Sequence, residues 1–313
     1  KGYDSRTFLI VGDGEANEGQ VWEAAIAAAT ADQTVRLLAN ATEDVTINKN
    51  ITLDLGSKTL TNTGKGYATI TIAKGATATV KNGSVVGGAS YYNIQNNGTA
   101  TFEGLTATAG NNGSSMIDNF GTLTIKSGTY TGGLDTIKNE PNAKLTVDGG
   151  TFTLTKGTSK GFTGVIFNYG DLTINNGTFI QSDKSAPYGQ AQVIHTDKNG
   201  SNTPSTVIKG GTFKNLCTSS TTAWTVRATN AAAGATKVSG GSFNKKISDS
   251  YCADGFIPTK NADGTYGVKE GKYVAKIGST GYETLEAAIK AVSSGKTVTL
   301  LENITANGMD IKK

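Results

Sequence analysis

A short phrase recurs seven times between residues 79 and 242 of this chain. Each copy is an extended run, a polar pair and, in most copies, a glycine followed by threonine or serine. Successive copies begin 22 to 34 residues apart, which fits one coil of a solenoid better than most helical repeats. The phrase therefore predicts stacked coils, one for each copy. The copies are Thr79–Ser84, Thr101–Thr106, Thr124–Thr129, Thr146–Thr151, Thr173–Thr178, Val207–Thr212 and Lys237–Ser242.

Within a copy, apolar and polar residues alternate. Leu123 and Ile125 would point to one side of a strand while Thr122 and Thr124 point to the other. One such strand cannot bury its apolar side alone, but a second coil stacked about 4.8 Å above it pairs the backbone and extends the core. We therefore predict an all-β fold, a right-handed parallel β-helix. Aromatic residues follow five copies, at Tyr130, Phe152, Phe179, Phe213 and Phe243.

A second repeated element lies upstream of the phrase, where isoleucine precedes asparagine by two residues. Asparagine tolerates the left-handed backbone of a corner, and stacked side-chain amides can bond from coil to coil. We predict a structural asparagine ladder here, not a row of ligands for a metal or a sugar. His195 follows Ile194 and is interpreted as a substituted corner position. The triplets are Ile94–Asn96, Ile117–Asn119, Ile137–Asn139 and Ile166–Asn168.

Residues 22–42 and 285–305 match without a gap, at an offset of 263 residues. Each copy reads as a helix followed by a strand. A helix at the start of a β-helix would cover an otherwise open sheet edge. We predict a strand and capping helix in 1–34, the parallel β-helix in 35–248, a closing β-hairpin in 249–270, and the start of a second tandem module in 271–313.

The helix-then-strand entry, the run Asp44–Leu60, the Gly-Thr-Phe coils and the segment Ala253–Phe256 together resemble the right-handed β-helix repeats of large bacterial cell-surface adhesin-like proteins. The similarity covers nearly the whole chain. It implies a secreted or wall-displayed protein built from tandem modules. The resemblance implies no catalytic residues in this sequence.

Charge and hydropathy exclude two classes of partner. The net charge of +4 comes almost wholly from lysine, with arginine only at Arg6, Arg36 and Arg227, so we predict no nucleic-acid binding. No stretch approaches 18 apolar residues, so we predict no membrane insertion. Cys217 and Cys252 have no metal-ligand spacing, and whether they form a disulfide stays open.

Residues 11–25 resemble the Gly-Asp-Gly segment of transketolases, which binds thiamine diphosphate through a divalent cation. The resemblance implies that Asp13 would be the metal ligand. That family completes the site with an asparagine roughly 30 residues on and a doubly wound α/β domain. Asn40 and Asn48 instead belong to the entry of the solenoid. We predict no cofactor and no metal site.

Catalysis by a β-helix needs paired carboxylates or a calcium cluster on one face. The acidic residues of the coils occupy different places, so we predict that the chain is not an enzyme; a polysaccharide-acting lyase or hydrolase is the alternative. Aromatic side chains in turns and insertions can stack on sugar rings. They are candidates for binding glycans or host-surface and matrix proteins from an extracellular or cell-wall location. These residues are Tyr91, Tyr92, Tyr188 and Trp224.

Overall fold

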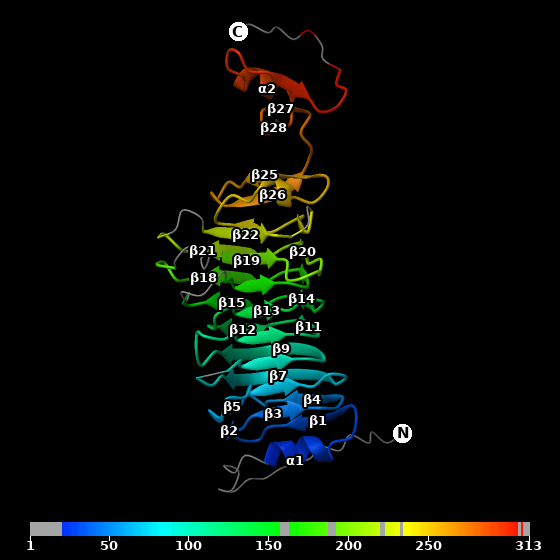
Figure 1. Ribbon diagram of the computed structural model, residues 1–313, viewed down its shortest axis with the longest axis vertical. Helices are drawn as coiled ribbons and strands as arrows, with labels where there is room; N and C mark the ends of the chain where they lie inside the picture. The colour runs from blue at the N-terminus through cyan, green and yellow to red at the C-terminus, as the bar shows by residue number, and fades with distance from the viewer. Residues whose placement is uncertain are drawn as a thin grey trace.

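The computed structural model describes residues 21–89, 91–156, 163–186, 192–219, 223–231, 234–305 and 308, without the side chains of residues 21–24. The chain forms a tall stack of coils, with its first and last described elements at opposite ends (Figure 1). Each coil contributes strands to three sides, and each strand pairs in parallel with the equivalent strand of the next coil. The predicted parallel β-helix is confirmed.

Sides 1 and 2 belong to one 18-stranded sheet, because β7 (Thr77–Val86) and β9 (Thr99–Thr108) run through both. Side 1 also contains β1 (Gln33–Arg36), β4 (Ile51–Asp54), β11 (Thr122–Ile125), β14 (Lys144–Val147), β17 (Asp171–Ile174), β20 (Ser205–Ile208) and β23 (Thr236–Val238). Side 2 contains β2 (Ala41–Thr42), β5 (Thr59–Thr61), β12 (Gly128–Thr131), β15 (Thr151–Leu154), β18 (Thr178–Gln181), β21 (Thr212–Asn215) and β24 (Ser242–Phe243).

Side 3 is a separate sheet of eight strands. Its strands are short, and four of them end in the asparagines singled out in the sequence. They are β3 (Val45–Ile47), β6 (Ile70–Ile72), β8 (Ile94–Asn96), β10 (Ile117–Asn119), β13 (Ile137–Asn139), β16 (Ile166–Asn168), β19 (Gln192–Asp197) and β22 (Trp224–Thr229).

The recurring phrase sets the register between coils. Thr124 pairs with Thr101 on one side and Thr146 on the other, as the aligned copies predict. The glycine before the closing threonine turns the chain between sides 1 and 2. It has positive φ in the later coils, for example +108° at Gly150 and +129° at Gly177, a region that favours glycine.

The aromatic residues form one stack inside side 2. Adjacent ring centroids lie 4.7 to 5.0 Å apart, and adjacent ring planes differ by 7° to 10°. All five rings are fully buried. The Tyr130 hydroxyl donates to the Ser127 carbonyl at 3.1 Å, so the one polar ring of the stack is satisfied. The stack consists of Tyr130, Phe152, Phe179, Phe213 and Phe243.

The asparagine ladder runs inside side 3. The Nδ2 of each asparagine donates to the Oδ1 of the next, from Asn96 to Asn119 at 2.7 Å, to Asn139 at 2.7 Å and to Asn168 at 2.8 Å. Each Nδ2 also reaches a backbone carbonyl of the following coil, as from Asn139 to Asp171 at 3.1 Å. The predicted structural ladder is confirmed.

Different elements cover the two ends of the stack. Helix α1 (Val21–Ala28) buries Ala25 and Ile26 against the first coil. At the other end β25 (Phe256–Lys260) and β26 (Tyr266–Glu270) form an antiparallel hairpin, and β26 pairs with β24. The short helix η1 (Asp249–Tyr251) precedes this hairpin.

Beyond the hairpin lies a small unit at the C-terminal end of the stack (Figure 1). It contains β27 (Ala275–Ile277), β28 (Thr280–Tyr282), α2 (Leu285–Ala291) and β29 (Val298–Leu300). The division of the chain at residues 34, 248 and 270, with a second module from 271, stays a prediction.

The ladder gives the first testable prediction. Replacement of Asn139 by alanine removes two amide–amide bonds from a buried column, so we expect a loss of about 2–4 kcal/mol in the free energy of unfolding. Asn175→Ala removes an exposed bond to Asp148 and is the matched control, with an expected loss within about 0.5 kcal/mol. Urea unfolding of both variants measures the difference, and equal losses would contradict a stabilising ladder.

Candidate functional site

Side 3 carries a column of chemically varied residues that point away from the core. Its strands point the residue between isoleucine and asparagine away from the core, and parallel pairing lines these residues into one column. We call this column the side-3 row. On side 1 the corresponding outward column is mainly threonine. The row runs Thr46, Thr71, Gln95, Asp118, Lys138, Phe167, His195 and Arg227.

Charged groups lie together at the fourth and fifth positions of the row. Lys138 forms an ion pair with Glu140, the residue that follows Asn139 in the ladder. Asp118 lies in the adjacent coil, beside Lys138, Glu140 and Tyr92, and is fully buried. Burial, followed by the repulsion of Glu140, raises the pKa of Asp118 to about 7. Pairing of β10 with β13 thus brings Asp118 close to Glu140, although the two carboxyls occupy different positions of their coils.

A second buried carboxyl, Asp135, lies at the edge of this group. It accepts hydrogen bonds from the Gly164 amide at 2.9 Å and from the Ser115 hydroxyl at 3.3 Å. Burial raises its pKa to about 7 as well. The pKa of Lys138 is raised, because the Glu140 and Asp118 carboxylates outweigh the lowering effect of burial. The net charge of this part of the row therefore changes with pH near neutrality, because Asp118 and Asp135 lose their protons there.

Aromatic groups occupy the middle of the row. The Phe167 ring lies 4.6 Å from Tyr169 and 4.7 Å from His195, measured between ring centroids. Lys138 Nζ lies 5.8 Å from the centre of the Tyr169 ring. His195 is buried, its Nε2 is 2.7 Å from the Thr229 hydroxyl, and burial lowers its pKa to about 3. It is therefore a neutral ring at physiological pH.

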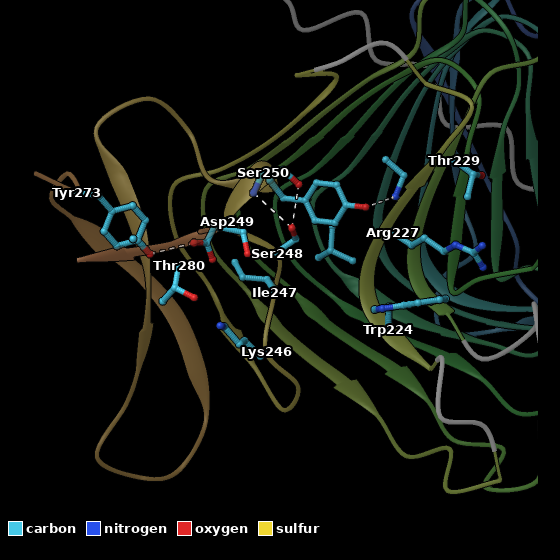
Figure 2. Close-up of a pocket in the computed structure, with 15 residues that line it drawn as sticks. Trp224, Arg227, Thr229, Lys246, Ile247, Ser248, Asp249, Ser250, Tyr273 and Thr280 are labelled. Atoms are coloured by element: carbon cyan, nitrogen blue, oxygen red, sulfur yellow. Dashed lines mark hydrogen bonds between the residues drawn. The ribbon is translucent and has the colours of Figure 1, made fainter. Parts of the chain in front are cut away.

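The row ends at a groove of about 940 Å³ between the last coil and the C-terminal unit. In Figure 2 the Arg227 guanidinium lies over the Trp224 ring, 4.5 Å from its centre. The Tyr251 hydroxyl accepts from the Ala228 amide at 2.9 Å.

The opposite wall of the groove contains the Tyr273 hydroxyl, which donates to Asp249 at 3.1 Å. Ser248 and Ser250 hydroxyls lie 2.9 Å apart on the floor. The groove thus joins aromatic surface to many hydroxyl groups.

Three of the four predicted binding residues lie beside this row, but the structure does not bring all three together. Tyr91 and Tyr92 are half-buried neighbours with ring centroids 4.6 Å apart, and they shortly precede Gln95, the third member of the row. Trp224 is half-buried at its end, five coils away, or about 24 Å at 4.8 Å for each coil. Tyr188 lies outside the described residues. The role of all four in binding stays a prediction.

Sequence reasoning missed the row itself. The signal was present as the middle residue of each isoleucine–asparagine triplet, which has to face outward when both neighbours face the core. The interpretation of His195 as a corner residue was wrong. Thr196 pairs with Asn168 and takes the ladder position, whereas His195 pairs with Phe167 in the outward row.

Other candidate chemistry gives no site among the described residues. They contain no group of three histidine, cysteine, aspartate or glutamate side chains that could hold a metal ion. Asp13 lies outside them, and only the last part of the transketolase-like segment, from Val21, is seen, within α1. Cys217 and Cys252 are free, buried thiols. Within the same residues no helix has the length and hydrophobicity to cross a membrane.

Comparison with protein-family models, with curated proteins and with solved structures finds no match to this chain.

The buried acids predict how stability depends on pH. Because the folded pKa of Asp118 lies above its ordinary value of 3.8, its contribution is fully present below pH 3.8 and is lost as the pH rises through about 7. Asp118→Asn should therefore flatten the decline in unfolding free energy between pH 5 and pH 8. Asp254→Asn, an exposed carboxyl, is the control. Urea unfolding at several pH values tests this, and a decline unchanged by Asp118→Asn would refute it.

His195 acts in the opposite direction, because its folded pKa lies below its ordinary value of 6.5. Its contribution is present above pH 6.5 and is lost as the pH falls towards 3. His195 is present in both the unmodified chain and Asp118→Asn. The difference between their unfolding free energies therefore reports the contribution of the Asp118 carboxyl alone.

Proposed function

We propose that this chain is an extracellular structural and adhesive module of a bacterial surface protein, which binds glycans or host-surface groups through many weak contacts. One observation carries the proposal: the half-buried rings of Tyr91, Tyr92 and Trp224 lie along the same side of the stack as the half-buried cations Lys138 and Arg227. The resemblance of its coils and closing hairpin to cell-surface adhesin-like repeats supports the extracellular or cell-wall location.

Rigidity supports this role. Parallel pairing continues from β1 to β23 on side 1, so the position of each outward side chain is fixed by the coils on either side. Preformed surfaces lose little conformational entropy on binding. A rigid stack therefore lets weak contacts add along an extended ligand, and tandem modules would multiply them.

The chemistry of the row suits saccharides. The half-buried rings of Tyr91, Tyr92 and Trp224 can offer apolar faces to sugar rings, while Lys138 and the groove hydroxyls can hydrogen-bond to sugar hydroxyl groups. Equivalent positions of adjacent coils lie about 4.8 Å apart, so a linear ligand lying along the stack meets a new set of side chains at each coil.

Binding by a glycan array, followed by titration of the glycans retained, tests the proposal on the full chain. We expect Trp224→Ala and Tyr91→Ala each to weaken binding by about 1 kcal/mol, roughly fivefold, through loss of ring contact. Tyr67→Ala removes an aromatic ring that is 65% exposed and belongs to the loop between β5 and β6, so it serves as the control. Retention of no glycan, or equal affinity in all three variants, would count against the proposal.

A polysaccharide-acting lyase or hydrolase is the second candidate, favoured by the Asp118–Glu140 pair. A carboxyl with a pKa near 7 beside a second carboxyl resembles the acid and base that glycosidic cleavage requires. Against it, Asp118 is 0% exposed, so a substrate cannot reach it without movement of the groups around it.

A reducing-sugar and unsaturated-product assay across plant and host polysaccharides separates the two candidates. The adhesive module predicts no product above background from either the unmodified chain or Asp118→Asn. Product release by the unmodified chain that is lost in Asp118→Asn would establish the enzyme, provided that circular dichroism shows the variant to be folded.

A further inference from the structure

The matching segments 22–42 and 285–305 lie at opposite ends of the structure. In each, a short helix precedes a strand, α1 before β1 and α2 before β29. At the offset of 263, Ile26 corresponds to Ile289, Val35 to Val298 and Leu37 to Leu300. The contacts that the first segment makes therefore indicate which kind of neighbour the second segment can bind.

At the N-terminal end the segment is covered by a coil. Strand β1 pairs in parallel with β4, which sets Val35 opposite Leu53. The Leu37 amide donates to the Asp54 carbonyl at 2.9 Å. Ile26, Val35 and Leu37 are 2%, 1% and 1% exposed.

At the C-terminal end the same face is open. β29 is the edge of the three-stranded sheet β28-β27-β29, and among the described residues its second edge has no neighbouring strand. Leu300 is 50% exposed, against 1% for its counterpart Leu37. Ile289 and Val298 are half-buried where their counterparts are buried. The unit lies beyond the hairpin, away from the coils (Figure 1).

We propose that α2 and β29 form a docking face for the first coil of a second parallel β-helix of this same kind, joined in tandem. A strand with the pattern of β4 adds in parallel to the open edge of β29, with Val298 opposite the Leu53 position. Edge-strand addition satisfies the backbone, and the apolar side chains of the coil cover Leu300. This inference does not depend on glycan binding.

A coil in tandem fits better than the first coil of another molecule. In this chain the first coil is already covered by α1, and Lys49 Nζ donates to the Ala27 and Ala29 carbonyls at 2.8 and 3.0 Å. A second molecule would have to displace its own α1 to offer that coil. A coil that follows Thr305 directly has no competing helix.

The test compares the chain with an extended form in which residues 43–270 are repeated after Thr305. A cysteine at position 300, from Leu300→Cys, is labelled with a maleimide and located by mass spectrometry. Cys217 and Cys252 are buried and are followed separately. We expect labelling to slow at least about tenfold in the extended form, because the position becomes buried.

Leu301→Cys is the matched control. Its counterpart Leu38 stays 36% exposed with the coil in place, and Leu301 is 47% exposed now, so its labelling rate should change little. Hydrogen exchange at the Leu300 amide, without any substitution, gives a second measurement should the cysteine variant fail to fold, and slower exchange in the extended form is expected.

Equal labelling or equal amide exchange at position 300 in the two forms would overturn the proposal. Protection of Leu300→Cys in the unextended chain that grows with protein concentration would assign the face to a second molecule and would also overturn the tandem arrangement.

Discussion

Parallel pairing between successive coils determines where almost every side chain of this protein lies. A strand of one coil has little apolar surface to bury by itself, and its core consists of the equivalent residues above and below. On side 1 these are aliphatic or aromatic residues in strict register, such as Leu53, Val80 and Phe102. A slip of one residue would expose this column to water and bury threonines, so the register is strongly specified.

Two uncharged ladders reinforce this register, the aromatic stack inside side 2 and the asparagine ladder inside side 3. The asparagine column exchanges side-chain bonds that only equivalent positions can make, and the aromatic column stacks rings at the spacing of the coils. With these columns fixed, insertions between strands do not disturb the pairing, although successive copies of the phrase vary from 22 to 34 residues apart. Variation is thereby confined to the outward positions and the connecting segments, which is where the candidate site lies.

Much of this fold follows from the sequence alone. The alignment of Thr101, Thr124 and Thr146 gives their pairing directly, because repeated residues must face the same way in repeated coils. The site was harder to predict, since its members are not repeated. Asp118 and Glu140 sit at different positions of their coils, and only the placement of Glu140 just past the ladder brings the two carboxyls together. Tyr92 comes from a connecting segment, whose path over the row no periodicity determines.

The same geometry explains why the recurring phrase is rich in threonine, asparagine and glycine. It also explains why like charges do not occupy equivalent positions of adjacent coils in the side-3 row. A parallel stack places equivalent side chains about 4.8 Å apart, so a repeated charge would repel its neighbours along the whole column. Uncharged groups can repeat without this cost. In the side-3 row the sequence of groups is carboxyl, amine, phenyl, neutral imidazole and guanidinium, so no two like charges occupy adjacent coils. Burial then keeps His195 neutral beside Arg227, and the charged part of the row stays compatible with the stack that carries it.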